Sequence, residues 1–138
     1  MKAELAANYR PSKGESFMNS HQKEYFRRKL LNWREELLRE SKETLVHLRE
    51  ESGHEADVAD RASLETDRSL ELRTRDRERK LIAKIDEALL RVENGTYGYC
   101  VETNEPISLS RLEVRPIAML GLEAQERHER MEKSHRDD

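Results

Sequence analysis

Three groups of residues in this sequence have types and spacing that could carry chemistry: histidines, a cysteine and a pair of aspartates. The histidines show no HExxH motif and no other metal-ligand spacing, so we expect them to be surface residues. They are His21, His47, His54, His128 and His135. The chain has no Gly-rich phosphate loop and no Gly-x-Ser-x-Gly elbow. The sequence therefore favours a protein that is not an enzyme.

Cys100 is the only cysteine of the chain. One thiol forms neither an internal disulfide nor a cysteine-built zinc site, so we expect no bound metal. The ordinary interpretation of such a residue is a buried, inert thiol.

Asp57 and Asp60 stand at the expected start of a helix, close to Ala62. Asp57 can cap the helix, and Asp60 falls in the first turn, where the helix dipole favours negative charge. The alternative is that both residues carry acidic groups to a distant target. The two interpretations are compatible, because a capping carboxylate uses one oxygen and leaves the other available.

A basic run follows further along the same expected helix, from Arg73 to Lys80. Its odd-numbered arginines are two residues apart and spread around a helix, so they do not form one stripe. A solvated surface with acidic partners is favoured over a docking surface for an acidic protein.

The composition indicates which secondary-structure elements position these residues. Charged residues make up 40% of the 138 residues and apolar residues 35%, with only two Phe, one Trp and four Tyr. That is too little apolar material for a thick core, but it is enough for a seam between long helices. One helix is expected over residues 20–52, with its apolar face at Phe26, Leu30, Trp33 and Leu37. A second is expected over residues 58–93, with Ile82, Ile85, Leu89 and Val92.

We therefore predict a mainly α fold, a long antiparallel two-helix coiled coil with a small globular region. Its parts are a mobile lead-in (1–18), the hairpin (19–94), a turn-rich region (95–116) and a C-terminal helix with a polar tail (117–138). The helices meet at a tip (53–62) that begins with Gly53, and both seams fade toward it. Asn19 or Ser20 is the expected cap of the first helix, and Pro116 is the expected start of the last one. An extended piece is expected around residues 107–112.

Net charge and hydropathy limit the partners. The formal net charge is −3, which argues against binding nucleic acid through a broad basic surface. No segment approaches the ~20 apolar residues of a membrane-spanning helix, and the first ten residues lack the apolar stretch of a signal peptide. A cytoplasmic protein is expected.

Several runs of the sequence together resemble the DksA family of bacterial transcription regulators, over about residues 18–134. They are Phe26–Arg34, Asp57–Ala62, Ser69–Ile82, Tyr97–Cys100 and Arg111–Pro116. The resemblance implies a coiled-coil arm on a small globular domain. It also implies a monomer that binds RNA polymerase rather than promoter DNA, with the arm in the secondary channel of the enzyme.

The resemblance also implies roles for particular residues. The tip motif of the family falls on Asp57, Asp60 and Ala62, which would destabilise promoter open complexes. Ribosomal RNA promoters would be repressed, and some amino-acid biosynthesis promoters activated. The alarmone guanosine tetraphosphate (ppGpp) would bind at the polymerase interface, and the family positions for it are Leu81, Lys84 and Arg115. A fourth position, usually Lys in the family, is Gln125.

The sequence departs from the family at the zinc site. Typical members hold zinc with two Cys-x-x-Cys pairs, and here those positions read Cys100, Thr103, Gly121 and Ala124. One thiolate cannot hold structural zinc, so the chain resembles the metal-free variants of the family. We expect apolar packing in place of the metal, from Ile107, Leu109, Leu112, Ile117, Met119, Leu120 and Leu122.

Two other classes of protein remain as alternatives. A transcript-cleavage factor of the Gre type also carries an acidic tip on a coiled coil, but it needs a larger β-rich domain than residues 95–138 can form. A coiled-coil scaffold would need a long uninterrupted apolar seam, and here the seam fades toward the tip.

Overall fold

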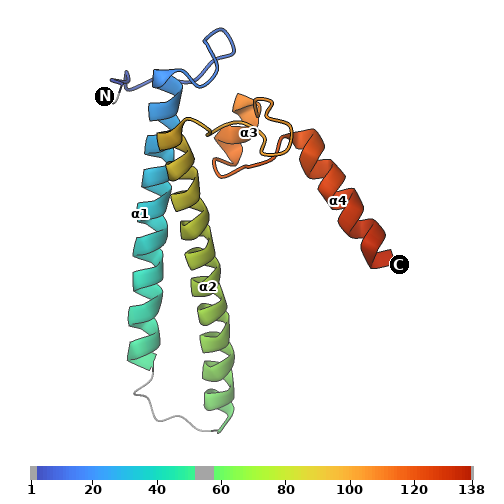
Figure 1. The fold of residues 1–138 in the computed structure, drawn as a ribbon. Coiled ribbons are helices and arrows are strands. Elements are labelled where there is room, and N and C mark those ends of the chain that lie inside the picture. Colours follow the sequence, from blue (N-terminus) through green and yellow to red (C-terminus); the bar gives the residue numbers. More distant parts are fainter. Residues whose placement is uncertain (1–2, 52–57, 138) are drawn as a thin grey trace. The chain divides into compact units, whose positions relative to one another are not determined.

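The structure is a computed structural model that describes residues 3–51 and 58–137. Four helices follow one another: α1 (Ser20–Glu51), α2 (Val58–Asn94), α3 (Leu109–Val114) and α4 (Leu122–Asp137), as Figure 1 shows. The part of the chain that is described contains no strand, only a single antiparallel bridge between Tyr99 and Pro106. The predicted mainly α class and the two long helices are confirmed.

The chain divides into two compact units. We call residues 31–86 the hairpin unit, and residues 1–30 together with residues 87–138 the terminal unit. The division passes through both long helices, and each unit is described by itself below.

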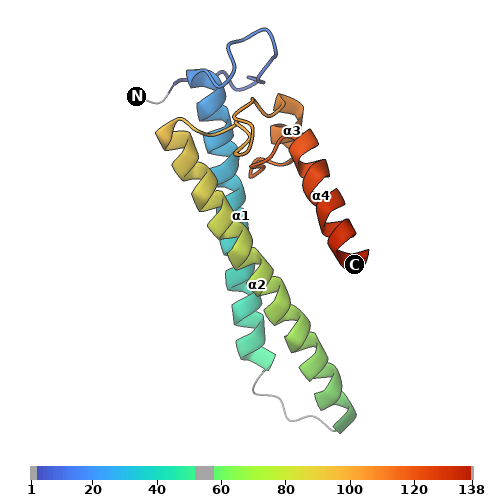
Figure 2. The same ribbon diagram turned by 45° about the vertical axis from the view of Figure 1, so that its right-hand side comes forward.

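Within the hairpin unit, α1 and α2 run side by side in opposite directions (Figures 1 and 2). Leu37 and Ile85 are buried between them. The Nε atom of Arg34 lies 2.7 Å from a carboxylate oxygen of Asp86. The predicted antiparallel pairing is therefore confirmed. The predicted turn at Gly53 lies outside the described residues.

The seam of the hairpin unit becomes polar toward its outer half. Glu78 occupies a buried seam position, while Leu70 and Leu72 are both 54% exposed. Three buried polar atoms have no hydrogen-bond partner in the described part, and all belong to this stretch: Oε2 of Glu71, Nε of Arg75 and Oε2 of Glu78. The predicted fading of the apolar seam is confirmed, and its replacement is a set of charged side chains.

The terminal unit is built around the other ends of the same two helices. Of the two predicted caps, Asn19 caps α1: its side-chain oxygen accepts a hydrogen bond from the backbone N–H of Gln22 at 2.9 Å. At the end of α2, Gly95 adopts a positive φ of 83°, and the N–H of Thr96 bonds back to the carbonyl of Arg91. The core of this unit contains Phe26, Leu30, Ala88, Val92, Tyr97, Ile107, Leu112 and Ile117.

Residues 3–18, expected to be a mobile lead-in, belong to the terminal unit and make specific contacts there. The carboxylate of Glu15 accepts hydrogen bonds from the hydroxyl groups of Tyr9 and Ser12. The backbone N–H of Met18 donates to the side-chain oxygen of Gln22 at 2.7 Å, and Met18 is buried. The lead-in is thus tied to the first turn of α1.

Two predictions about the C-terminal region were wrong. The segment expected to be extended contains α3, which Ser108 caps by accepting from the N–H of Arg111. The last helix begins at Leu122 rather than directly after Pro116, whose carbonyl instead accepts a hydrogen bond from the hydroxyl of Tyr97 at 2.7 Å. Residues 116–118 form a buried turn before α4 begins.

Candidate functional site

The predicted tip residues lie at the start of α2. Asp60 falls in the first turn of α2, as predicted, and both Asp60 and Ala62 are exposed. Asp57 lies outside the described residues. A carboxylate in the first turn of a helix is favoured by the positive end of the helix dipole, so Asp60 combines this favourable position with an exposed side chain.

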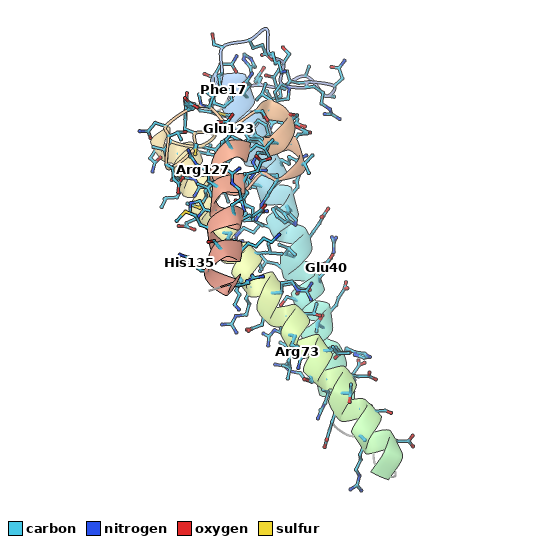
Figure 3. The ribbon with its side chains drawn as sticks, turned by 90° about the vertical axis from the view of Figure 1, so that its right-hand side faces the viewer. Phe17, Glu40, Arg73, Glu123, Arg127 and His135 are labelled. Carbon is cyan, nitrogen blue, oxygen red and sulfur yellow. The ribbon has the colours of Figure 1, made fainter. Side chains whose placement is uncertain are left out.

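A second surface of α2 was missed in the sequence. Four cations recur at intervals of four, three and four residues, which places them within one narrow stripe of the helix. They are Arg73, Arg77, Lys80 and Lys84, which we call the basic stripe. All four are exposed, and among the described residues none of them forms a hydrogen bond or an ion pair. Arg73 can be followed on α2 in Figure 3.

The sequence interpretation had grouped the arginines by their alternate spacing, and that grouping concealed the stripe. Arg75 belongs to a different face, because its side chain is half-buried toward the seam. Arg79 lies on yet another side, with an ion pair to Asp76 at 3.8 Å. The signal that finds the stripe is the helical period applied to lysine and arginine together.

The residues predicted for ppGpp fall in both units. Leu81 is half-buried and Lys84 exposed, three residues apart on α2 of the hairpin unit. Arg115 belongs to the terminal unit, where it follows α3 and is exposed. The side-chain amide of Gln125, in α4, donates to Glu129 at 3.2 Å.

The structure brings Cys100 and Gly121 of the predicted zinc-site positions together. A Cβ atom built on Gly121 would lie 4.0 Å from the Cβ of Cys100. Cys100 and Ala124 are buried, while Thr103 is exposed. The backbone supports the same arrangement, since the N–H of Val101 donates to the carbonyl of Met119 at 2.9 Å.

Comparison with known proteins assigns both regions. Residues 22–92 match the family model described as "DnaK suppressor protein DksA, N-terminal domain", and residues 95–130 match "Prokaryotic dksA/traR C4-type zinc finger". The chain belongs to the DksA family. It is 67% identical over 132 residues to the RNA polymerase-binding transcription factor DksA of Caulobacter vibrioides, covering 96% of this chain and 93% of that relative.

More distant members of the DksA family agree. The factor of the same name from Escherichia coli K12 is 44% identical over 115 residues, which cover 83% of this chain and 76% of the relative. The solved structure of transcription factor DksA2 from Pseudomonas aeruginosa superposes with a TM-score of 0.80 at 44% identity. That match covers 85% of this chain and 90% of the other.

The zinc that the matched finger family implies does not fit the residues present. Structural zinc needs four good ligands, and these four positions supply one thiol, one hydroxyl and two residues without a side-chain donor. The described residues contain no group of three or more His, Cys, Asp or Glu side chains placed to hold a metal ion. In this member of the DksA family, the finger region therefore lacks the side chains that would bind zinc.

The Cys100 sulfur accepts hydrogen bonds from neighbouring groups. Burial alone would raise the pKa of this thiol. Hydrogen bonds from the Thr103 side chain and from the backbone N–H groups of Gly121, Thr103 and Glu102 outweigh burial and lower the pKa to about 7. The thiol is buried, as predicted, and its inertness stays a prediction.

The predicted apolar replacement for zinc is only partly confirmed. Ile107, Leu112 and Ile117 are buried in the core of the terminal unit. Met119 and Leu122 were expected to join them, but they are 38% and 59% exposed.

None of the described helices combines the length and the apolar character needed to cross a membrane.

Proposed function

We propose that this chain is a bacterial transcription factor that binds RNA polymerase and controls the lifetime of promoter open complexes. The observation that carries the proposal is the 67% identity, over 96% of the chain, to a relative named RNA polymerase-binding transcription factor DksA. Polymerase is then the partner rather than DNA, in keeping with the formal net charge of −3. The factor acts in the cytoplasm, where bacterial polymerase works, and has no catalytic role of its own.

We assign docking and effect to different parts of the hairpin unit. In the proposed complex the hairpin enters the secondary channel of polymerase, and the basic stripe faces acidic groups of the channel wall. Exposed cations without partners lose little on docking, because no existing ion pair has to break. The tip, with Asp57, Asp60 and Ala62, acts near the active centre and destabilises the open complex. Ribosomal RNA promoters are repressed in consequence, and some amino-acid biosynthesis promoters are activated.

We further propose that ppGpp strengthens this effect at the interface with polymerase. The ligand carries several phosphate charges, and Lys84 and Arg115 are exposed cations of the kind that bind phosphate. Leu81 would add an apolar contact. Gln125 supplies no charge at the fourth position, so the response is expected to be weaker than in members that have Lys there.

The experiment that tests the proposal is multi-round transcription by purified polymerase from a ribosomal RNA promoter, with and without ppGpp. The native chain should repress, and ppGpp should deepen the repression. Asp60→Asn should abolish repression while the affinity for polymerase stays within about twofold, since Asn keeps the size of Asp60 and removes its charge.

The matched control is Asp67→Asn, which removes an exposed carboxylate two turns further along α2 and should repress like the native chain. A native chain that binds polymerase without affecting the promoter would contradict the proposed function. Transcript cleavage in backtracked complexes would instead indicate a factor of the Gre type.

A further inference from the structure

The backbone of Arg115 is held by hydrogen bonds, while its side chain is exposed to solvent. Its N–H donates to the carbonyl of Arg111 at 2.8 Å, and its carbonyl accepts from the N–H of Ala118 at 3.0 Å. Its guanidinium is exposed and forms no hydrogen bond or ion pair among the described residues. The backbone of Arg115 is therefore fixed, and its charged group is exposed to solvent.

The segment before Arg115 is fastened to α1 through Glu113. One carboxylate oxygen of Glu113 accepts hydrogen bonds from the hydroxyl of Tyr25 and from the Nζ of Lys29, the latter at 3.2 Å. Burial and the neighbouring carboxylate raise the pKa of Tyr25 to about 12, so its hydroxyl remains a donor throughout the physiological range. These contacts tie the short helix α3 to two successive turns of α1.

The segment after Arg115 is fastened to the core through Tyr97. The Tyr97 side chain is 1% exposed, and its hydroxyl donates to the carbonyl of Pro116 at 2.7 Å. Its ring lies 5.7 Å from that of Phe26, measured between centroids, so the donor is itself held by packing. Burial raises the pKa of Tyr97, which keeps the hydroxyl protonated.

These contacts involve Glu113, two residues before Arg115, and Pro116, one residue after it. In both cases the partner side chains belong to the terminal unit. A six-residue helix has too few internal hydrogen bonds to hold its own end in place. Leu112 and Ile117 hold the neighbouring backbone by burial, and Glu113 and Tyr97 add the hydrogen bonds that tie it to α1 and to the core. With them, the position of Arg115 is fixed relative to α1.

We propose that Tyr97 and Glu113 are positioning residues for Arg115, holding its guanidinium in place for the phosphate groups of ppGpp. The proposal rests on the proposed function, and it adds to it the means by which the site is held ready. Ordering a flexible segment on binding lowers affinity, so a backbone that is already ordered gives the phosphate contact its full effect. Neither positioning residue needs to touch the ligand.

The experiment measures factor-dependent binding of labelled ppGpp to complexes of RNA polymerase with the full-length chain. It also measures repression without ppGpp and the melting temperature of each variant. Tyr97→Phe removes only the hydroxyl, and Glu113→Gln removes the charge that faces Lys29. Tyr99→Phe is the matched control, since no hydrogen bond of the Tyr99 hydroxyl is found in the described residues.

Arg115→Ala should raise the dissociation constant of ppGpp about tenfold, the loss of one charge-assisted contact. Tyr97→Phe and Glu113→Gln should each raise it about three- to tenfold, and Tyr99→Phe less than twofold. The decisive variant combines Tyr97→Phe with Arg115→Ala. It should bind ppGpp no worse than Arg115→Ala alone, because a positioning residue has no effect once the residue it positions is gone.

Each other outcome overturns the proposal in a recognisable way. If Arg115→Ala weakens ppGpp binding and Tyr97→Phe and Glu113→Gln do not, positioning is wrong and the proposed function stands. If the two variants weaken repression without ppGpp as much as with it, or if their effects add to that of Arg115→Ala, their role is general stability. If the native complex shows no factor-dependent ppGpp binding, the alarmone part of the proposed function fails, and positioning with it.

Discussion

Met18 lies against Gly98 so closely that a Cβ atom on Gly98 would be 2.7 Å from the Cε of Met18. The same atom would lie 3.2 Å from the ring of Phe17, and Gly98 has a φ of +90°. The end of the lead-in therefore packs directly on the turn that precedes Cys100. Glycine readily adopts this backbone conformation, and any added Cβ would have to displace the terminal methyl group of Met18.

We predict that Gly98→Ala lowers the free energy of unfolding by about 2–4 kcal/mol, from backbone strain and from the displaced Met18 and Phe17. Chemical denaturation of both proteins measures the difference. Gly95→Ala is the matched control: Gly95 also has a positive φ, of 83°, but nothing lies within 4 Å of the added Cβ. It should cost about 1 kcal/mol, from strain alone. Equal losses in the two variants would contradict the packing argument.

The turn-rich region should fold without metal, because the four finger positions retain a single thiol. We predict that a strong chelator leaves the melting temperature of the native chain unchanged within about 1 °C, since no metal-binding energy is coupled to folding. Elemental analysis of the purified protein should find well under one zinc per chain. A stoichiometric zinc content would contradict the prediction.

A gain-of-site variant is the control for the same prediction. Gly121 lies close enough to Cys100 for a substituted Cβ to be in ordinary van der Waals contact, at 4.0 Å. Combining Thr103→Cys, Gly121→Cys and Ala124→Cys should therefore create a tetrahedral thiolate site that binds about one zinc ion. In that variant, unlike the native chain, the chelator should lower the melting temperature.

The long helices were predictable because local signals and tertiary packing agree in them. The apolar period at Phe26 and Leu30, the cap at Asn19 and the stop at Gly95 all indicate the structure that forms. The short helix α3 was not predicted, because six residues give too little periodicity and only Ser108 marked its start.

Residues of the candidate site could be predicted only where they belong to a local sequence motif. Asp60 belongs to a recognisable run at a helix start, whereas the tie between Glu113 and Tyr25 spans 88 positions of sequence. The hydrogen bond from Tyr97 to Pro116 spans 19 positions, and no periodicity indicates such a pairing. What fixes Arg115 is therefore tertiary and was not visible in the sequence, although Arg115 itself was named there.

The buried carboxyl group of Glu78 should make the hairpin unit sensitive to pH. Burial first, and then the charge of Glu40, raises its pKa, while Arg75 and Arg77 act in the opposite direction. A carboxyl group whose pKa is higher in the folded state is stabilising when protonated. Its contribution is therefore present below the unfolded pKa and is lost as the pH rises through the folded one.

We predict that Glu78→Leu raises the free energy of unfolding at pH 7 by about 1–2 kcal/mol, because it fills the same seam position without a buried charge. The gain over the native chain should shrink as the pH falls through the raised pKa of Glu78, because Glu78 itself then becomes protonated. Denaturation at several pH values measures this. Glu65→Leu, at an exposed position of α2, should change stability by less than about 0.5 kcal/mol at each of these pH values.

The basic stripe gives the last prediction, which concerns docking. Replacing Arg73 and Arg77 together by Gln should weaken binding to RNA polymerase about three- to tenfold at low salt, since two exposed charge contacts are lost. The loss should diminish as the salt concentration rises, because the native contacts are themselves screened. Fluorescence anisotropy with labelled factor, repeated at several salt concentrations, measures both effects.

The control for the stripe is Arg79→Gln, which removes a cation from a different side of α2. Arg79 is paired with Asp76 and lies outside the stripe, so its loss should change affinity less than twofold and leave the salt dependence as it is. If Arg79→Gln weakens binding as much per charge as the stripe variant, net charge rather than the stripe controls docking. If the stripe variant binds as tightly as the native chain, polymerase contacts another face of the hairpin, and the exposed cations serve only solvation.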